Sequence, residues 1–401
     1  MARYVIHIGY GKTGTTALQT FLAANRASLR KHGIVYPEFR RDGVALGIDN
    51  HNVLGLALDD AGGWPRLSAE ECFRQFEAQR TAAAGCHTVL LSGESILGRP
   101  FPYPNAEVFR KAQNEKISKL RKLVAEHETT ILVYLRRQDH WIESSLNQGI
   151  KYGGLIPGGA GWSNEQYLEI IAPRLDYAAV LDQWAAYFGA ENIEVGVFEK
   201  DQLVNGNIID DVLDRFGLTR HDGFEVPETN VRTENPALSR DVIEVKRMLN
   251  SVSRPKFEER FLAEALMEVS RDMAADGRAR TYPIIDSSCR RALLERYAAA
   301  NQDVARRYLD RADGVLFHEP LPDDSAAADD YPGLTGEAVV EIHWRLRRKR
   351  RSAAGRWKLF REWSAQHLRR RPRLHAVVRA LRRATGLTGE ASLSGRPRDA
   401  S

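Results

Sequence analysis

Short apolar runs alternate with helical hydrophobic periods along the first half of the chain. The apolar runs predict strands at residues 4–8, 88–91, 131–135 and 193–198. Hydrophobic side chains at helical spacing predict helices over about residues 15–31, 107–126 and 177–188, the last with its aromatic side chains in the core. This alternation favours a parallel sheet with helices on both faces. We therefore expect an α/β fold built on a central parallel sheet flanked by helices.

Beyond residue 217 the strand pattern fades and helical periods dominate. They predict helices at about residues 238–249, 257–269 and 287–309, which we expect to cover the sheet and to shape one side of a site. Residues 320–336 are rich in Asp, Ala, Pro and Gly and are typical of a linker. We therefore divide the chain into a main domain, residues 1–335, and a C-terminal tail, residues 336–401.

The overall composition is that of a globular protein. The chain has 401 residues, of which 43% are hydrophobic, so it can bury a sizeable core. No apolar run approaches the roughly 20 residues that span a bilayer, and the N-terminus opens on a strand pattern instead of a secretion signal. The three cysteines are odd in number and lack metal-ligand spacing. They predict reduced thiols, no disulfide, no bound metal and a cytoplasmic location.

Positive charge is concentrated near the C-terminus. Residues 345–383 contain sixteen Lys or Arg and one Glu, so the net charge of +5 belongs to the tail. The tail also carries apolar stripes at helical spacing, formed by Trp357, Phe360 and Trp363 and by Leu374, Val377, Val378 and Leu381. Such a basic amphipathic helix can lie on an anionic membrane surface at the inner membrane face, hold an acidic polymer, dock on a partner or stay a solvated appendage. No nucleic acid partner is expected, because no reader motif is present.

The clearest chemistry follows the first apolar run, where a loop leads into an amphipathic helix. The loop reads Gly9-Tyr10-Gly11-Lys12-Thr13-Gly14-Thr15-Thr16. A strand, a glycine-containing loop and a helix N-terminus form an anion site, because backbone N–H groups and the helix dipole converge on a phosphate. Gly11 and Gly14 allow close backbone approach, and Lys12 adds a full positive charge beside Thr13. Thr15 and Thr16 supply hydroxyl donors.

The position of the lysine separates this loop from that of nucleoside triphosphatases. Their loop needs Lys directly after the last glycine, followed by Ser or Thr for magnesium. Here Thr15 takes that place and Lys12 precedes Gly14. The segment resembles the 5′-phosphosulfate loop of sulfotransferases that use 3′-phosphoadenosine 5′-phosphosulfate (PAPS), usually Pro-Lys-Ser/Thr-Gly-Thr-Thr/Ser. Gly11 stands where that pattern often has Pro.

A second element follows the third apolar run. Arg136 leaves the predicted strand and Ser144 lies within the next helix, so a guanidinium and a hydroxyl can close on one phosphate. Sulfotransferases bind the 3′-phosphate of PAPS with a strand-end Arg followed eight residues later by Ser, and Arg136 and Ser144 have this spacing. The sequence departs from the family at Arg137-Gln138, where many members have Asn or Asp and then Pro. The two phosphates of one cofactor account for both elements.

The resemblance covers about residues 3–250, including residues 196–218, which are similar to the family's strand, polar loop and helix ending in Phe-Gly-Leu. It implies a P-loop-like sulfotransferase fold and sulfuryl transfer from PAPS to a hydroxyl or amine of a small-molecule, lipid or glycan acceptor, without a metal. It also makes Arg232 and Asn235 candidates for contacts with the acceptor.

Sulfuryl transfer needs a base for the acceptor proton and a cation for the departing phosphate. Lys12 would be the cation. Family members place His or Glu after the second strand, so Glu94, at the end of the predicted strand 88–91, is the candidate base. His51 is the rival, because imidazole titrates near neutrality, and His7 is expected in the core or behind the site.

Two other functions stay open. A nucleotide-dependent phosphotransferase would use the same loop, although the displaced Lys12 and the missing magnesium ligand disfavour it. A non-catalytic phosphonucleotide-binding protein would use the same two anion sites and act through its tail. Both would bind a phosphorylated nucleotide, so the loop alone does not separate them from a sulfotransferase.

Overall fold

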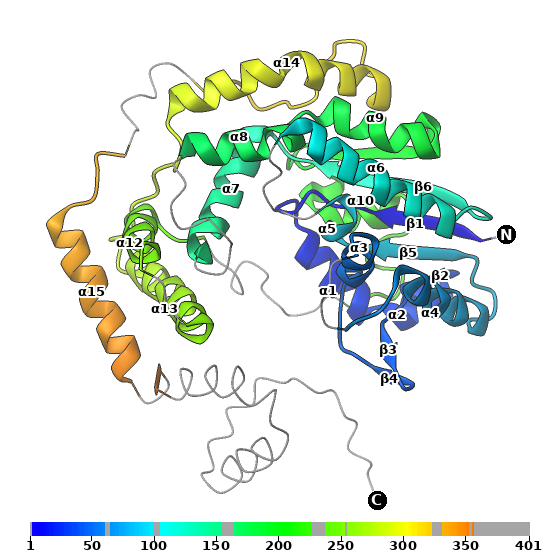
Figure 1. The fold of residues 1–401 in the computed structure, drawn as a ribbon, viewed down its shortest axis with the longest axis horizontal. Coiled ribbons are helices and arrows are strands. Elements are labelled where there is room, and N and C mark those ends of the chain that lie inside the picture. The colour runs from blue at the N-terminus through cyan, green and yellow to red at the C-terminus, as the bar shows by residue number, and fades with distance from the viewer. Residues whose placement is uncertain are drawn as a thin grey trace, which may run out of the picture. The chain divides into compact units, whose positions relative to one another are not determined.

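The structure is a computed structural model, in which residues 2–60, 65–98, 105–153, 164–225, 237–252, 255–322, 331–352 and 355–356 are described. The chain divides into two compact units (Figure 1). The first unit comprises residues 1–148, 161–240 and 281–333, and the second comprises residues 149–160, 241–280 and 334–401. This division differs from the boundary after residue 335 that composition suggests, because residues 241–280 belong to the second unit together with residues 334–401.

A five-stranded, fully parallel sheet forms the centre of the first unit. Its strands follow the order β2 (Ile34–Val35), β5 (Thr88–Ser92), β1 (Arg3–His7), β6 (Glu128–Leu135) and β7 (Ile193–Val197). The expected α/β fold with a central parallel sheet flanked by helices is therefore present. Four of the strands lie where the apolar runs predict them. The sequence pattern misses β2, because two residues are too short to give a period.

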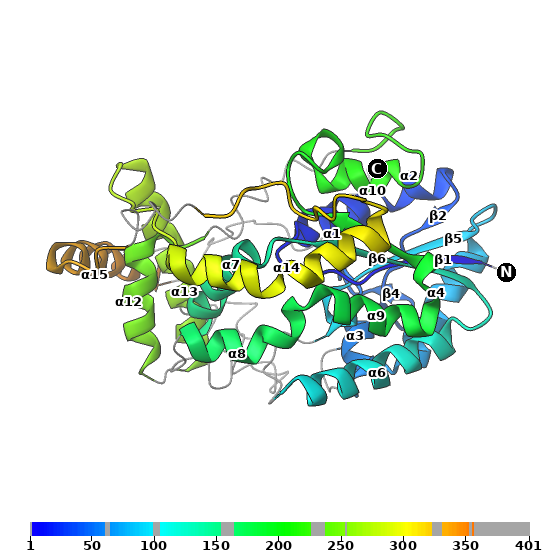
Figure 2. The ribbon, with the colours of Figure 1, turned by 90° about the horizontal axis from the view of Figure 1, so that it is seen from above.

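Helices cover both faces of this sheet, as Figure 2 shows. Side chains of the central strands, including Val5 and Leu132, form one buried cluster with α1 (Thr15–Ala24), α2 (Arg26–Lys31) and α10 (Ile208–Asp214). On the other face Tyr4 of β1 stacks on Phe73 of α4 (Ala69–Ala82) at 5.4 Å between ring centroids. The same face carries α9 (Tyr177–Phe188), which contacts β6 and β7, and α6 (Ala106–Leu123), which packs on α9.

Most of the predicted helices are present, with one break. The aromatic side chains of α9 are buried as expected, with Tyr177 and Trp184 fully enclosed. The single helix expected over residues 15–31 is wrong, because α1 and α2 meet at Asn25. The Asn25 amide donates to the Phe21 carbonyl and to the carbonyl of Glu225, 200 residues away, which fixes the chain in a non-helical turn.

The remaining elements of the first unit connect the sheet strands or cover them. Of these, α14 (Ser287–Leu309) contacts α9 and β7, so it covers the sheet as expected. The others are short connections or helices between strands. They are β3 (Arg40–Arg41), β4 (Val44–Ala45), α3 (Asn52–Leu58), α5 (Glu94–Leu97), α7 (Gln138–Lys151), α8 (Asn164–Leu175), and the 3-10 helices η2 (Ala190–Asn192) and η3 (Val204–Gly206).

The second unit contains helices in its described part. Its described helices are α12 (Arg240–Asn250), α13 (Lys256–Ala275) and α15 (Gly336–Arg351), and α15 packs on α13. The predicted helices near residues 238–249 and 257–269 therefore exist, but they belong to this unit and not to the unit that contains the sheet. A fully buried ion pair of 2.9 Å between Lys246 and Glu259 links α12 to α13. None of the described helices is both long and apolar enough to cross a lipid bilayer.

Candidate functional site

Three strands deliver the predicted site residues to one edge of the sheet. Strands β5, β1 and β6 are adjacent and parallel, so the loops after Ser92, His7 and Leu135 leave the same edge. In the strand order, the connection that leaves β1 runs past β5 to β2, whereas the connection that leaves β6 runs in the opposite direction to β7. In open α/β sheets a ligand crevice forms where neighbouring connections diverge in this way. Lys12 follows β1 and Arg136 follows β6, one on each side of this point.

The loop after β1 has the backbone of an anion cradle. Gly14 is the N-cap of α1 with φ 75°, and a Cβ there would come within 3.1 Å of Phe198 and Ile208, so both the backbone and the close neighbours favour glycine. No side chain of the described residues caps the N-terminus of α1, and its first turn holds no acidic residue. Its first amide groups and the positive end of its dipole are therefore available to an anion. A Cβ at Gly11 would meet no atom of the described residues within 4 Å, so these residues leave room for a larger side chain at this position.

Neighbouring side chains hold the loop in place. The buried Thr13 hydroxyl donates to the Tyr10 carbonyl at 2.7 Å, and the Trp141 indole donates to the Gly11 carbonyl at 2.8 Å. The Thr13 hydroxyl is thus used within the loop, whereas Thr16 is exposed at the start of α1. Of the three threonines predicted at the cofactor site, only Thr16 has an exposed side chain.

Glu94 contacts this loop from the end of β5. The buried Thr15 hydroxyl donates to Glu94 Oε1, and the Asn52 amide donates to Glu94 Oε2 at 3.3 Å. The same Asn52 accepts the Ser95 N–H at 2.9 Å through its Oδ1, so the amide is fixed in one orientation. Asn52 was not among the residues predicted for the site. Its only sequence signal is its place beside His51.

The rival base, His51, is enclosed in the core. Its Nδ1 accepts the Ser92 N–H at 3.0 Å, and its Nε2 is 3.0 Å from the Pro37 carbonyl. Both ring nitrogens are therefore occupied, and burial lowers the pKa of His51 to about 3. His51 supports the turn that presents Asn52 and has no free nitrogen for an acceptor proton. His7 is also buried, with Nδ1 2.9 Å from the Ser92 hydroxyl, as expected for a core position.

Lys12 is an unusual lysine in two respects. Its φ is 75°, a left-handed backbone conformation that residues other than glycine rarely adopt. Burial lowers the pKa of its amine to about 8, with Glu94 opposing the shift and Arg136 adding to it. The protein therefore keeps a strained, poorly solvated cation at the centre of the loop. Strain of this kind is concentrated at functional sites.

Arg136 joins the second element to the loop. Its Nη1 donates to the Lys12 carbonyl at 2.7 Å, and its guanidinium carbon lies 5.7 Å from the centre of the Phe198 ring. Burial lowers the pKa of Arg136. Ser144, one of the predicted phosphate ligands, is half-buried in α7, and its hydroxyl makes no hydrogen bond to any residue in the described part of the chain.

The neighbouring arginine has a different role. Arg137 is buried, and it pairs with Asp139 at 2.8 Å and with Glu319 at 2.8 Å. Although burial opposes ionisation, hydrogen bonds from Arg137 and Arg290 lower the pKa of Asp139 to about 2. Arg137 therefore anchors α7 to the segment after α14. Of the two consecutive arginines, only Arg136 points its guanidinium toward the loop of Lys12.

A cavity of about 460 Å³ adjoins Arg136 at the same edge of the sheet. Its walls include Phe198, Lys200 and His318, and its volume falls within the usual range for a small-molecule site. The acidic groups on its rim are engaged, because Asp201 contacts His318 Nδ1 at 2.7 Å and Glu199 accepts the His318 N–H at 2.7 Å. These three side chains have the composition of a cation site. Their contacts hold the residue 318 segment against the loop after β7.

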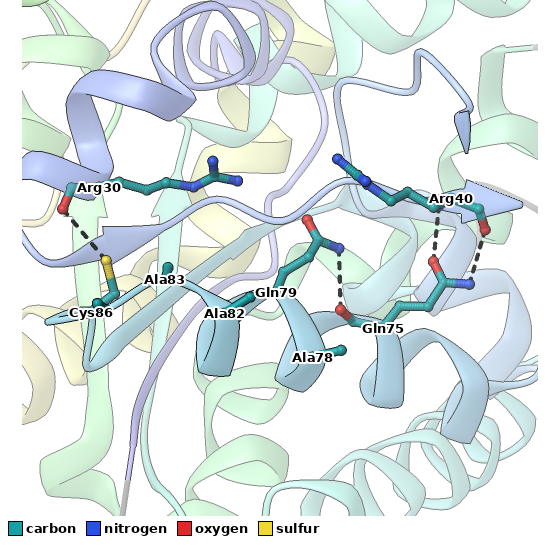
Figure 3. Close-up of a pocket in the computed structure, with 9 residues that line it drawn as sticks. Arg30, Arg40, Gln75, Ala78, Gln79, Ala82, Ala83 and Cys86 are labelled. Atoms are coloured by element: carbon teal, nitrogen blue, oxygen red, sulfur yellow. Dashed lines mark hydrogen bonds between the residues drawn. The ribbon is translucent and has the colours of Figure 1, made fainter. Parts of the chain in front are cut away.

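A second cavity, of about 630 Å³, contains none of the predicted residues (Figure 3). It lies between Arg30 and the α4 helix, next to Cys86 before β5, at the opposite end of that strand from Glu94. Gln75 binds the backbone of Arg40 across it, with hydrogen bonds of 2.9 and 3.1 Å. Two further predictions, Arg232 with Asn235 and the tail beyond residue 356, lie outside the described residues.

Comparison with known proteins provides little functional information. No family model matches the chain. The chain is 24% identical over 238 residues to an uncharacterized protein of Archaeoglobus fulgidus. The similar region covers 59% of this chain, and the chain spans 62% of that protein's length. This similarity therefore identifies neither a family nor a function for the chain.

Proposed function

We propose that the protein is a sulfotransferase that moves a sulfuryl group from PAPS to a hydroxyl or amine of a small-molecule, lipid or glycan acceptor. The observation that carries this proposal is the hydrogen bond of 2.7 Å between Arg136 and the Lys12 carbonyl. It joins two cationic elements that follow the adjacent parallel strands β1 and β6, at the edge of the sheet where neighbouring connections diverge. A ligand with two separate anionic groups suits this arrangement better than a ligand with one.

The loop itself supports a phosphosulfate as the group bound next to Lys12. The first turn of α1 offers backbone donors to a phosphate, and Lys12 stands before the last glycine instead of after it. Among the described residues no atom lies within 4 Å of the place where a Cβ at Gly11 would stand, so Gly in place of the family's Pro removes no packing contact of that Cβ with them. Arg136 would then take the 3′-phosphate with Ser144, and the adjoining cavity would hold other parts of the nucleotide.

In the proposed reaction each group has one task. The acceptor oxygen or nitrogen attacks sulfur, and its proton passes to Glu94. The bond from sulfur to the bridging oxygen breaks, and that oxygen keeps the electron pair as part of the nucleotide phosphate. Lys12 stabilises the negative charge that develops there. Thr15 and Asn52 hold the Glu94 carboxylate at the loop, so its position relative to Lys12 is set before the acceptor arrives.

The partial burial of Lys12 fits this role. Its pKa of about 8 leaves most of the amine protonated at neutral pH, yet the cation lacks part of its hydration. An anionic ligand replaces the missing hydration, so its binding should be favoured over binding to a fully solvated lysine. No metal is required for the charge stabilisation described here.

Two measurements test the proposal. Calorimetric titration of the full-length protein should show tighter binding of 3′-phosphoadenosine 5′-phosphate than of ATP with magnesium, and the reverse order would favour a phosphotransferase. A screen with PAPS carrying radioactive sulfur should then transfer label to one of a set of hydroxyl and amine acceptors. Tight nucleotide binding without transfer to any acceptor, and without release of sulfate, would indicate a non-catalytic nucleotide-binding protein.

A further inference from the structure

The positive side chains of α15 fall into two sets. Arg345 pairs with Asp276 at 2.7 Å, and Lys349 contacts Asp272 at 3.0 Å and Glu268 at 3.3 Å. These acidic partners belong to α13 or directly follow it, and Ile342 is fully buried on the same side of α15. One face of α15 is therefore satisfied within the second unit, by both charge and apolar contact.

The other face of α15 is exposed and strongly basic. Arg347, Arg348, Arg350 and Arg351 are all exposed, and none of them forms an ion pair with any residue in the described part of the chain. They share this face with two exposed apolar side chains, Val340 at 69% and Trp344 at 52%.

These exposed side chains form one stripe along the helix. Val340, Trp344, Arg347 and Arg351 follow one another at intervals of three or four residues, the spacing of one helix face. The guanidinium of Arg348 lies 4.8 Å from the centre of the Trp344 ring, so this arginine flanks the stripe. We call Val340, Trp344, Arg347, Arg348 and Arg351 the α15 stripe. Its apolar side chains, Val340 and Trp344, lie toward the N-terminal end of α15, and its arginines lie toward the C-terminal end.

We propose that the α15 stripe docks the protein on an anionic lipid surface. Tryptophan is favoured at the level of the lipid headgroups, and arginines beside it can bind lipid phosphates. An acidic polymer would engage the arginines but would leave Val340 and Trp344 in water. The sequence continues the basic character from Arg356 to residue 383, which adds to the attraction. This inference does not depend on the proposed sulfotransferase activity.

The structure also predicts which cations do not take part. Arg345 and Lys349 are neutralised by α13, so they contribute little to attraction by an outside surface. Each unpaired basic residue close to an anionic leaflet strengthens binding about fivefold. Reversing three arginines of the α15 stripe should therefore weaken binding by at least about a hundredfold.

The test is sedimentation of the full-length protein with vesicles of phosphatidylcholine alone or of phosphatidylcholine with about one-third phosphatidylserine. The test variant is Arg347→Glu, Arg348→Glu, Arg351→Glu. Its matched control is Arg74→Glu, Arg110→Glu, Lys111→Glu, which changes the net charge equally at exposed positions on α4 and α6. Wild type and control should pellet only with the anionic vesicles, and the test variant should stay in the supernatant.

Three results would overturn the proposal. These are equal pelleting of the test variant and wild type, pelleting of wild type with neutral vesicles, and no pelleting of wild type with either. A second variant, Trp344→Ser, keeps every charge and should weaken binding severalfold. If the triple variant does not fold, as judged by circular dichroism, unchanged binding of Trp344→Ser contradicts the proposal by itself.

Discussion

Replacing Lys12 by glycine should stabilise the ligand-free protein while it destroys the anion site. Two costs of Lys12 would disappear. The amine loses hydration in the fold, which lowers its pKa from the ordinary value of 10.5 to about 8. The backbone adopts a φ of 75°, which glycine reaches without strain.

The expected gain can be worked from these two observations. For a fully enclosed amine, a pKa shift of this size destabilises the folded protein by roughly 3 kcal/mol. We take about half of this destabilisation for Lys12, because solvent reaches part of its side chain. Relief of the left-handed backbone adds about 1 kcal/mol, and the greater freedom of glycine in the unfolded chain removes about 0.5–1 kcal/mol. The free energy of unfolding should therefore rise by about 2 kcal/mol at neutral pH.

The pH dependence separates the two contributions. The pKa of Lys12 is lower in the folded than in the unfolded protein, so its penalty is fully present below about pH 8. The penalty disappears as the pH rises from about 8 to 10.5, because the folded protein then carries a neutral amine. The advantage of Lys12→Gly should shrink over this range to the part that comes from the backbone.

The assay is urea unfolding at neutral pH and at about pH 10, followed by circular dichroism, with Asp310→Gly as control. Asp310 has a φ of 54° and an exposed side chain at the end of α14, so its replacement relieves backbone strain without changing a buried charge. The gain for Asp310→Gly should be smaller and independent of pH. If Lys12→Gly is no more stable than wild type at neutral pH, Lys12 is not a strained, desolvated cation.

Three further variants test the division of labour in the site. Glu94→Gln should keep the affinity for 3′-phosphoadenosine 5′-phosphate but lower turnover by about a hundredfold or more, because the base is lost. Turnover near that of wild type would show that Glu94 is not the base. Asn52→Leu should lower turnover by about tenfold with unchanged nucleotide affinity, because one hydrogen bond that orients Glu94 is lost; an equal loss of affinity would show a role in nucleotide binding instead. Nucleotide affinity measured by calorimetry should be constant between about pH 7 and 8, where the phosphates are already deprotonated, and should fall by up to about tenfold per pH unit above this range, as Lys12 loses its proton. Lys12→Arg should remove this dependence, and an identical profile in that variant would assign the titration to another group.

The parts of the fold that sequence pattern predicts are those with a local physical cause. The strand that ends at His7, the loop through Lys12 and the helix that begins at Thr15 each show as periodicity, glycine placement or charge over a few residues. The fully buried strand 131–135 is also a plain apolar run. Such features depend on backbone geometry that the residues themselves dictate.

The features that sequence pattern misses depend on distant partners. Asn25 ends α1 because its side chain binds the backbone of Glu225, and nothing near Asn25 in the sequence indicates this partner. Asn52 reaches Glu94 across 42 positions, whereas its neighbour His51 turns into the core. Local sequence does not indicate which of two adjacent polar side chains faces the site. The pairing of α15 with α13 likewise depends on acidic residues about 70 positions earlier.

The most direct test of the proposed function is the contribution of the ribose phosphate to nucleotide affinity. Calorimetry should compare 3′-phosphoadenosine 5′-phosphate with adenosine 5′-phosphate, in wild type and in Arg136→Leu. The charge-assisted hydrogen bonds of Arg136 predict that the 3′-phosphate strengthens binding to wild type by at least tenfold, and that most of this advantage is lost in Arg136→Leu. Equal affinity of wild type for the two nucleotides would contradict the two-phosphate site, and the proposed sulfotransferase function would be refuted with it.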